Sequence, residues 1–312
     1  MDLSGTDLLL TGGAGFVGSA LADRLVEANR VTVVDDLSNG HRSAVPDDAR
    51  FVEADLTDPD AVDRVVTGDL DAVFHLAAAD KHVNSDAPRE QFEANQAITH
   101  NLLERMDEVG VDNIAYTSSS TVYGEAPRPT PEDCPAEPIS VYGAGKLAEE
   151  GLLSVYASTH DLTAWVFRFA NVVGPRDREG VVPDFVAKLR DDPSTLTILG
   201  DGRQEKSYLH VSDCVDAMCH VVETADADDP FHVYNLGTRT TTSVRRIADV
   251  VSEEMGVDPE YRFTGGDRGW PGDVPRMRLS IEKLAALGWE PSLSSEAAIR
   301  RAVGELLAAD GD

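Results

Sequence analysis

The hydrophobic pattern in the first half of the chain alternates between two periods. Short apolar runs, which predict buried strands, are separated by stretches in which apolar residues recur three and four positions apart, which predicts helices. Regular alternation of strand and helix is typical of a parallel sheet with helices on both faces, so we expect a doubly wound α/β fold. The predicted strands are 8–10, 30–34, 51–52, 72–76, 113–117 and 164–169, and the longest predicted helices are 89–109 and 140–160.

The pattern becomes less regular after Gly174-Pro175, where shorter predicted elements replace the alternation. We expect a smaller α/β lobe there, closing over the strand ends on the C-terminal side of the fold. The expected domains are residues 1–170 and residues 171–312, with room for later segments to return to the first domain. The predicted helices of the lobe are 183–190, 212–224, 243–255, 280–287 and 294–307, and its predicted strands are 197–199, 233–235 and one near Tyr208.

The first predicted strand runs into a glycine-rich turn, Thr11-Gly-Gly-Ala-Gly-Phe-Val-Gly18, and the turn opens into a predicted helix. Gly12 is expected in a turn conformation that is closed to other residues, and Gly15 lets a pyrophosphate approach the backbone. Gly18 lets the helix pack against the strand, so that the bare amides of the first helical turn face the phosphates. The predicted dinucleotide contacts in this turn are Gly12, Gly15, Phe16, Val17 and Gly18.

An acidic residue ends the second predicted strand, because Asp35 lies 17 residues beyond Gly18. A carboxylate at this place holds both hydroxyls of an adenosine ribose and repels a 2′-phosphate, which predicts NAD rather than NADP. Glycine spacing alone is weak, because a structural strand–helix–strand corner with a solvated Asp has the same glycines. The order of strand, turn, helix and acid favours a Rossmann-type NAD-binding domain at 1–170, and 171–312 then forms a substrate-binding lobe.

The charge of the chain argues against nucleic acid as a partner and favours an environment of high salt. Lys and Arg number 27 against 56 Asp and Glu, which gives a net charge of −29, and five of the cations are lysines. Such a protein repels nucleic acid phosphates. The acids are interspersed with periodic apolar residues, which argues against disorder. An ordinary acidic protein is one interpretation, but scarce lysine with abundant aspartate favours a halophilic protein in a cytosol of very high salt, where ions screen the self-repulsion.

Membrane and metal chemistry have no signal in the sequence. No apolar run reaches the ~18 residues of a membrane span. The first residues, Met1-Asp2-Leu3-Ser4-Gly5, have neither the basic region nor the apolar segment of a signal peptide, so we expect a cytoplasmic protein. Cys134, Cys214 and Cys219 have no metal-ligand spacing, so we expect reduced thiols and no metal.

Tyr142 and Lys146 lie four residues apart at the start of the helix predicted at 140–160, and thus on one helix face. A free tyrosine is a poor base at neutral pH, because its pKa is near 10. A lysine ammonium beside it favours the phenolate, and the same lysine can hold a nicotinamide ribose. Ser119 follows the strand predicted at 113–117, and its hydroxyl can share a proton between Tyr142 and a substrate oxygen. Singly, such residues are usually surface pairs or turns, but behind a dinucleotide turn they predict catalysis.

These motifs together resemble the extended short-chain dehydrogenase/reductase family, the NAD-dependent nucleotide-sugar epimerases and dehydratases, over nearly the whole chain. The glycine turn matches the cofactor turn of that family, and Ser119, Tyr142 and Lys146 fall on its catalytic triad. The stretches 168–176, 200–204 and 272–275 are similar to its substrate-binding segments. The further cofactor contacts that the resemblance implies are Asp35, Asp36 and Asn39 at the ribose and adenine edge, Asp55 and Leu56 at the adenine, Leu76, Ala77 and Ala78 on the pyrophosphate side, and Asn95 on the long helix.

Within this family, the stretch 118–124 favours one branch. The 4,6-dehydratases carry Asp-Glu around the position of Thr121, because elimination of water needs extra acid and base groups, and decarboxylases and GDP-mannose dehydratases usually carry Glu there. A threonine at this place resembles the 4-epimerases of UDP-hexoses, in which only a hydride and one proton move. The resemblance therefore implies inversion at C4 of a nucleotide sugar, UDP-galactose to UDP-glucose being the leading case, through a transient 4-keto sugar on NAD-dependent chemistry.

The substrate contacts that the resemblance implies are partly altered in this chain. The family often has Arg-Asp where this chain has Lys206-Ser207, and Arg where it has Trp270. Both positions usually touch the nucleotide diphosphate, so Arg203, Lys206 or Arg268 are expected to substitute. Met277 falls where the family sets the width of the sugar pocket, and this flexible side chain neither clearly admits nor clearly excludes an N-acetyl group. The implied substrate residues are Ser119, Tyr142, Asn171, Arg203, Lys206, Arg268 and Met277.

Other interpretations stay open at this point. UDP-glucuronate and UDP-N-acetylhexosamine are alternative epimerase substrates. A net NAD-dependent oxidoreductase or dehydratase is a second class of enzyme, and an NAD-sensing regulator is a class without catalysis. Such regulators commonly lose the Tyr or the Lys that this chain keeps at positions 142 and 146. The resemblance also implies a homodimer, in which the helices 89–109 and 140–160 of two copies form a four-helix interface.

Overall fold

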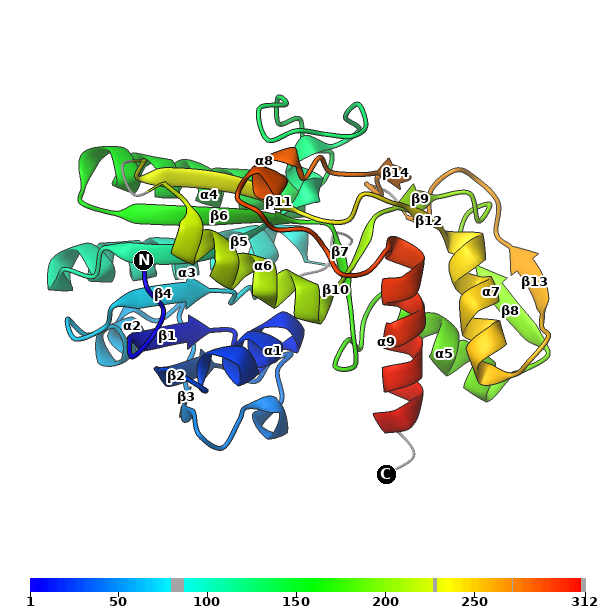
Figure 1. Cartoon of the computed structure of the whole chain (residues 1–312), viewed down its shortest axis with the longest axis horizontal. Coiled ribbons are helices and arrows are strands. Elements are labelled where there is room, and N and C mark those ends of the chain that lie inside the picture. The colour runs from blue at the N-terminus through cyan, green and yellow to red at the C-terminus, as the bar shows by residue number, and fades with distance from the viewer. Residues whose placement is uncertain (80–86, 227–228, 271, 310–312) are drawn as a thin grey trace. The chain divides into compact units, whose positions relative to one another are not determined.

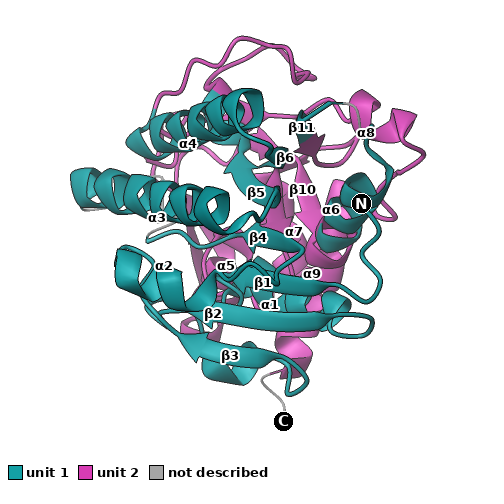
Figure 2. Cartoon of the chain, turned by 90° about the vertical axis from the view of Figure 1, so that its left-hand side faces the viewer, with its two compact units in different colours: residues 1–122, 140–168, 215–234 teal, residues 123–139, 169–214, 235–312 magenta. Residues whose placement is uncertain are grey.

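A computed structural model of the chain describes residues 1–79, 87–226, 229–270 and 272–309. These residues form two compact units, each of which gathers segments that are distant in the sequence (Figure 2). Unit 1 comprises residues 1–122, 140–168 and 215–234, and unit 2 comprises residues 123–139, 169–214 and 235–312. Unit 1 therefore regains residues after the expected boundary at 170, and unit 2 takes residues before it. The binding role of each part stays a prediction.

Unit 1 is built on a seven-stranded sheet with the order β11-β6-β5-β4-β1-β2-β3 (Figure 1). The strands are β1 (Asp7–Thr11), β2 (Arg30–Asp35), β3 (Arg50–Glu53), β4 (Ala72–His75), β5 (Asn113–Ser119), β6 (Thr163–Phe169) and β11 (Phe231–Leu236). The neighbours from β5 to β3 pair in parallel. Because β1 lies between β4 and β2, the chain extends the sheet first on one side of β1 and then on the other. Open α/β sheets bind ligands at such a reversal, beyond the carboxyl ends of the strands.

Helices cover both faces of this sheet. They are α1 (Phe16–Leu25), α2 (Pro59–Val65), α3 (Pro88–Val109), α4 (Val141–Thr159) and α6 (Val211–Thr224), with 3₁₀ turns at Arg42–Ala44 and Ser120–Tyr123. The helices α2, α3 and α4 lie on one face, and α1 and α6 lie on the other (Figure 2). The helix α3 starts on a proline, where the missing amide costs nothing, and ends at Gly110 in a left-handed conformation.

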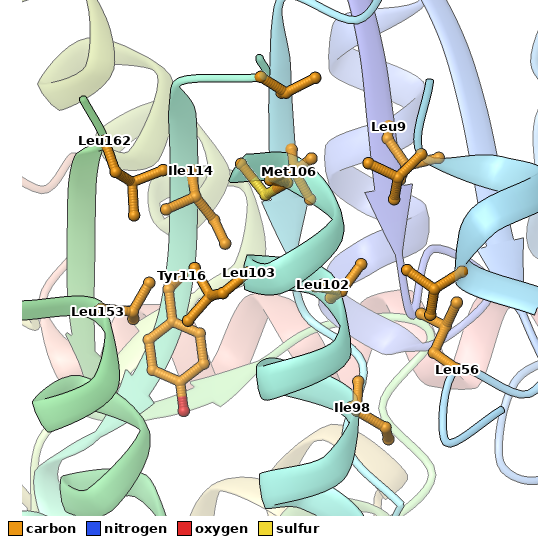
Figure 3. Close-up of a cluster of buried hydrophobic side chains, with 14 of the residues drawn as sticks. Leu9, Leu56, Ile98, Leu102, Leu103, Met106, Ile114, Tyr116, Leu153 and Leu162 are labelled. Atoms are coloured by element: carbon orange, nitrogen blue, oxygen red, sulfur yellow. The ribbon is translucent and has the colours of Figure 1, made fainter. Parts of the chain in front are cut away.

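A hydrophobic core of unit 1 lies between the sheet and the helices α2 to α4 (Figure 3). Leu102, Leu103 and Met106 of α3 face Ile114 and Tyr116 of β5, and all five are at most 1% exposed. Burying side chains of this size contributes about 1.5–3 kcal/mol each before the entropy of ordering is counted. The core therefore holds α3 and α4 against one face of the sheet.

Unit 2 consists of short strands and helices. Its strands are β7 (Asn171–Val173), β8 (Thr195–Ile198), β9 (Glu205–Lys206), β10 (Tyr208–His210), β12 (Thr242–Ser243), β13 (Glu260–Phe263) and β14 (Arg276–Met277). Its helices are α5 (Val181–Asp191), α7 (Val244–Met255), α8 (Glu282–Ala286) and α9 (Ser295–Ala309). The strands form the pairs β7–β10 and β8–β13 and the three-stranded sheet β12-β9-β14. A second hydrophobic core joins α5, α7 and α9 around Leu189, Ile247 and Ile299.

The α/β expectation is confirmed, and most of the predicted elements differ from the observed ones by one or two residues at their ends. The strands β9, β12 and β14 were not predicted, because each has two residues and carries no periodic signal. The strand β13 was not predicted either, since its residues Glu260–Phe263 are mostly exposed and two of them are charged. Among the described residues, no helix has both the length and the low charge that a bilayer crossing requires.

Candidate functional site

The glycine turn after β1 has the backbone that the sequence predicts. Gly12 has a φ of 67°, in the left-handed region that favours glycine. A Cβ at Gly12 would lie 2.7 Å from the Ala77 nitrogen, and a Cβ at Gly18 would lie 2.1 Å from the Gly12 oxygen. Both glycines are therefore required for close packing, Gly12 against the chain after β4 and Gly18 against the turn itself rather than the strand.

The start of α1 offers backbone donors beside this turn. Gly15 caps the helix in an extended conformation, and among the described residues no side chain accepts a hydrogen bond from its first turn. The Ser19 amide donates to the Gly15 carbonyl at 2.9 Å and starts the helical hydrogen bonds, so the amides of Phe16, Val17 and Gly18 before it are left for an external acceptor. A Cβ at Gly15 would meet only the Gly12 oxygen, at 3.3 Å, which leaves the outer side of the turn open. This cradle fits a pyrophosphate.

Asp35 ends β2 next to the glycine turn. Its carboxylate accepts hydrogen bonds from the amides of Ala14, at 3.0 Å, and Leu37, at 2.9 Å. Burial raises the pKa of Asp35, while these backbone donors act in the opposite direction. The carboxylate is thus oriented by the same turn that would hold the phosphates. Its neighbours Asp36 and Asn39 are exposed, and Asp36 accepts from the amide and hydroxyl of Ser38.

The chain after β4 is held from two sides. Thr11 accepts from the Leu76 amide with its carbonyl, at 3.1 Å, and from the Ala77 amide with its hydroxyl, at 3.2 Å. Asn95 of α3 accepts from the Ala79 amide at 2.7 Å. The segment Leu76, Ala77 and Ala78 therefore lies at the carboxyl edge of the sheet next to Gly12, as expected for the pyrophosphate side.

Two further predicted cofactor residues follow β3. Asp55 is exposed and accepts hydrogen bonds from the Thr57 amide, at 2.9 Å, and the Thr57 hydroxyl, at 2.7 Å. Leu56 is only 4% exposed, and its side chain belongs to the core cluster of unit 1 (Figure 3). An adenine contact at this place would thus use Asp55 and the backbone rather than the leucine side chain.

The three predicted catalytic residues belong to unit 1. Ser119 is the last residue of β5, and its Oγ accepts from the Thr121 amide at 3.2 Å and the Thr121 hydroxyl at 3.0 Å. Ser140 caps α4 by accepting from the Gly143 amide, which starts the helix just before Tyr142. Tyr142 is half-buried, whereas Lys146, one turn later, is 3% exposed. Lys146 of α4 contacts Tyr116 of β5, the strand whose last residue is Ser119.

Two buried carboxylates of α4, those of Glu149 and Glu150, were missed by the sequence analysis. Glu149 lies 3.4 Å from the Lys146 ammonium. Glu150 makes a bidentate pair with Arg168 of β6, at 3.0 and 2.6 Å, and also accepts from the Ser118 hydroxyl. This pair fixes the end of β5 next to Ser119. The i, i+3 spacing of Lys146 and Glu149 is visible in the sequence, but such pairs usually lie on a solvated helix face.

The predicted diphosphate residues lie in unit 2, and two of them converge on Asp273. The Lys206 ammonium lies 2.6 Å from the Asp273 carboxylate and 5.3 Å from the centre of the Trp270 ring. Arg268 donates to the Asp273 carbonyl oxygen and pairs with Glu125. Arg203 is exposed at the side chain. Asp273 is 3% exposed and belongs to the stretch 272–275, which the sequence analysis marked as a substrate-binding segment without giving Asp273 a role of its own.

The remaining predicted substrate residues also lie in unit 2. Asn171 opens β7 and pairs with Tyr208 in β10, and its side chain is partly exposed. Met277 is 7% exposed in β14 and stands opposite Lys206 in the ladder with β9. The candidate cofactor and catalytic residues are therefore gathered in unit 1, and the candidate substrate residues, apart from Ser119 and Tyr142, in unit 2.

Comparisons with known proteins agree over nearly the whole length. The profile of the NAD dependent epimerase/dehydratase family matches residues 8–237. A UDP-glucose 4-epimerase of Mycolicibacterium smegmatis is 35% identical over 309 residues, which cover 95% of this chain and 96% of that protein. A solved UDP-galactose 4-epimerase is 39% identical with a TM-score of 0.90, covering 97% of this chain and 99% of that one. The structure of UDP-glucose 4-epimerase with UDP-glucose from Thermotoga maritima is 32% identical with a TM-score of 0.89, covering 98% and 100%.

The matched region contains the glycine turn, Asp35, and the residues Ser119, Tyr142 and Lys146. The cradle at the start of α1 and the oriented carboxylate of Asp35 fit the dinucleotide that the family uses. This chain therefore belongs to the NAD dependent epimerase/dehydratase family, the nucleotide-sugar enzymes that have NAD as their cofactor.

Proposed function

We propose that this enzyme inverts C4 of a nucleotide sugar, with UDP-galactose and UDP-glucose as the leading pair. The observation that carries the proposal is the environment of Ser119 in unit 1. The hydroxyl of Thr121 donates a hydrogen bond to Ser119 Oγ. An elimination or a decarboxylation would need an acid or base at the position that Thr121 occupies. The similarity to enzymes that bear the name UDP-glucose 4-epimerase supports the same branch.

The residues of this chain would then act in a short sequence. When bound, NAD would supply reversible hydride transfer at C4 of the sugar, the chemistry that an inversion through a 4-keto sugar requires. Tyr142 takes the proton of the C4 hydroxyl and later returns it. Ser119 holds the same sugar oxygen through its hydroxyl. The ammonium of Lys146 favours the phenolate of Tyr142 and holds the nicotinamide ribose.

The other cofactor contacts follow from the geometry of unit 1. We assign the pyrophosphate to the first turn of α1 and to the segment Leu76–Ala78, and the adenosine ribose to Asp35. The proposed set of cofactor contacts is completed by Asp36, Asn39, Asp55, Leu56 and Asn95. The proposed substrate residues of unit 2 are Asn171, Arg203, Lys206, Arg268 and Met277, of which Lys206 and Arg268 are already paired with acidic residues.

A second candidate substrate class follows from Met277. Its side chain is unbranched and flexible and lies in a two-residue strand, so it can adapt to a larger group at C2 of the sugar. UDP-N-acetylhexosamines are therefore the main alternative, and UDP-glucuronate is the next.

A panel of nucleotide sugars tests the proposal. The purified enzyme is incubated in molar KCl with UDP-galactose, UDP-N-acetylglucosamine, UDP-glucuronate and dTDP-glucose, and the products are separated by chromatography. The proposal predicts that UDP-galactose yields UDP-glucose with the highest kcat/KM. A 4-keto-6-deoxy product, or oxidation that consumes NAD stoichiometrically, would assign the enzyme to another branch.

We also propose a homodimer, which the surface of α4 supports. One side of this helix exposes a row of small and apolar residues, namely Val141, Ala144, Ala148, Gly151 and Val155. Val155 is 55% exposed. An exposed row of small and apolar residues on a helix fits a helix–helix interface. Light scattering in molar KCl should give twice the 33.6 kDa of one chain.

We propose in addition that the enzyme is halophilic. At a net charge of −29 the compact state repels itself, and this repulsion weakens as the Debye length falls to ~3 Å at 1 M salt. The Tm should therefore rise from dilute buffer to molar KCl, and an unchanged Tm would contradict the proposal.

A further inference from the structure

Lys146 is buried together with a carboxylate in the interior of unit 1. The side chains of Lys146 and Glu149 are 4% and 2% exposed, and the ammonium lies 3.4 Å from Glu149 Oε2. The ammonium also donates to the Tyr116 hydroxyl at 3.0 Å and lies 4.8 Å from the centre of that ring. A buried ammonium is costly unless it is paired and hydrogen-bonded. Glu149 and Tyr116 together supply both conditions.

Glu149 is itself held by several donors. Its Oε2 accepts from the hydroxyls of Tyr116 and of Thr99, the latter at 3.2 Å, and its Oε1 accepts from the Gln96 amide at 3.1 Å. Burial and the neighbouring Glu149 raise the pKa of Tyr116 well above its ordinary value, so its hydroxyl keeps the proton. The tyrosine therefore donates to Glu149 and accepts from Lys146, which leaves this group of side chains one arrangement of protons.

A chain of hydrogen bonds continues from Glu149 to the glycine turn. Thr99 gives its proton to Glu149, so it must accept from His75 Nε2, 3.1 Å away. The other ring nitrogen, Nδ1, then accepts from the Thr11 hydroxyl at 2.8 Å, and this hydroxyl accepts from the Ala77 amide. Burial and the charge of Lys146 lower the pKa of His75 to about 3, so the ring stays neutral. Each hydrogen bond in this series therefore keeps the same donor and the same acceptor.

We propose that Glu149 and Tyr116 are positioning residues that hold the ammonium of Lys146 in place before the cofactor binds, and that Thr99, His75 and Thr11 connect this ammonium to the turn at Gly12. This inference rests on the proposed role of Lys146 at the nicotinamide ribose. It adds to that role a group of side chains that is assembled in the protein alone.

Stability by itself does not account for this arrangement. Replacing both members of a buried ion pair by apolar side chains of similar volume is often neutral or stabilising, so two apolar side chains at positions 146 and 149 would hold α4 to the core equally well. The neighbouring pair of Glu150 and Arg168 already joins α4 to β6. The carboxylate of Glu149 instead serves to keep the charged side chain of Lys146 at one place in the interior.

The binding of NAD and of ADP to the full chain, stripped of nucleotide, separates a positioning role from a structural one. ADP has the pyrophosphate and adenosine of NAD but lacks the nicotinamide ribose. Glu149→Gln should weaken NAD binding about tenfold while changing ADP binding less than about twofold, because only the NAD complex uses Lys146. Tyr116→Phe should give the same pattern with a smaller loss. Isothermal calorimetry in molar KCl measures all of these affinities.

Two further variants complete the test. Glu27→Gln removes one exposed charge from the same unit and should leave both affinities unchanged. In Lys146→Met, which should weaken NAD binding selectively, adding Glu149→Gln should cause no further loss of NAD affinity. It should also raise the Tm of Lys146→Met by roughly 5 °C, because the single variant leaves a buried carboxylate without its counter-charge.

The outcomes separate the two proposals. Equal losses of NAD and ADP affinity in Glu149→Gln, no loss at all, or losses that add to those of Lys146→Met would overturn the positioning role. If Glu149→Gln does not fold, as judged by circular dichroism, Tyr116→Phe decides by the same NAD-to-ADP ratio. Unchanged NAD binding in Lys146→Met would instead overturn the role of Lys146 in the proposed function.

Discussion

Each unit of this protein buries a lysine against an acidic residue, and the two pairs differ in what surrounds them. Lys146 of unit 1 lies among Glu149, Tyr116 and the side chains of a packed helix and strand, with its own side chain 4% exposed. Lys206 of unit 2 lies in a two-residue strand against Asp273 and the Trp270 ring, with its side chain 15% exposed. The first lysine is thus fixed by the core, whereas the second is supported by a loop.

From this difference we infer that Lys146 serves the chemical step and that Lys206 serves the binding of the substrate. Groups that must meet reacting atoms within a fraction of an ångström are best held by packed helices and strands. Groups that hold a diphosphate tolerate more adjustment. We therefore expect substitutions in the interior of unit 1 to change kcat and substitutions around Lys206 to change KM.

The largest effect should come from Tyr142→Phe. Removing the hydroxyl deletes the proposed base, so kcat should fall by at least ~10²–10⁴-fold while KM, NAD binding and the Tm change little. Steady-state kinetics with UDP-galactose, together with calorimetry for NAD, measures these quantities. Full activity in this variant would remove Tyr142 from the mechanism.

A pH dependence of stability tests the interior of unit 1. In the folded chain the pKa of His75 is about 3, so the ring stays neutral at pH 5, whereas in the unfolded chain its pKa is 6.5 and the ring is protonated at pH 5. Stability therefore falls as the pH is lowered through this interval, and His75 alone accounts for about 2 kcal/mol of the loss at pH 5. Denaturant unfolding in molar KCl at pH 7 and pH 5 should show a larger loss for the wild type than for His75→Gln. Equal losses would contradict a buried neutral imidazole.

The cofactor preference tests Asp35. Asp35→Ala removes the carboxylate that would meet a 2′-phosphate, so the ratio of NAD to NADP affinity should fall by about tenfold or more. Titration of both nucleotides measures the ratio. Tighter binding of NADP than of NAD by the unaltered protein would show that this carboxylate does not set the preference.

The smallest effect is expected in unit 2. Lys206→Met removes a cation that already has a carboxylate partner, so KM for the nucleotide sugar should rise by only about threefold with kcat unchanged. The opposite effects of Lys206→Met on KM and of Tyr142→Phe on kcat test whether the two units differ in this way. A fall in kcat without a change in KM would place Lys206 among the groups that serve the chemistry.

Much of unit 1 could be predicted because its signals are local. The glycine turn, the helical spacing after it and Asp35 lie within one short stretch, and α3 and α4 were placed to within one residue at each end. The candidate catalytic residues followed from the same kind of spacing. These features need no knowledge of which distant segments meet.

The parts that were missed depend on contacts between distant segments. Glu149 and Tyr116 are 33 positions apart, and Glu150 and Arg168 are 18 apart, so only the packing of α4 on the sheet brings each pair together. The strands β9 and β14 are two residues long and are defined by their pairing alone. A hydrophobic pattern contains no record of such partners, which is why the polar interior of unit 1 and most of the small sheets of unit 2 came only from the structure.

The fate of the C4 hydrogen distinguishes epimerisation at C4 from the other reactions of this family. UDP-galactose that carries deuterium at C4 is supplied to the purified enzyme in molar KCl without added NAD, and the product is analysed by mass spectrometry and NMR. Epimerisation at C4 predicts UDP-glucose with the deuterium retained at C4 and no lasting NADH absorbance, because the same hydride leaves and returns within one active site. Loss of the deuterium to solvent, or a product other than the C4 epimer, would contradict it.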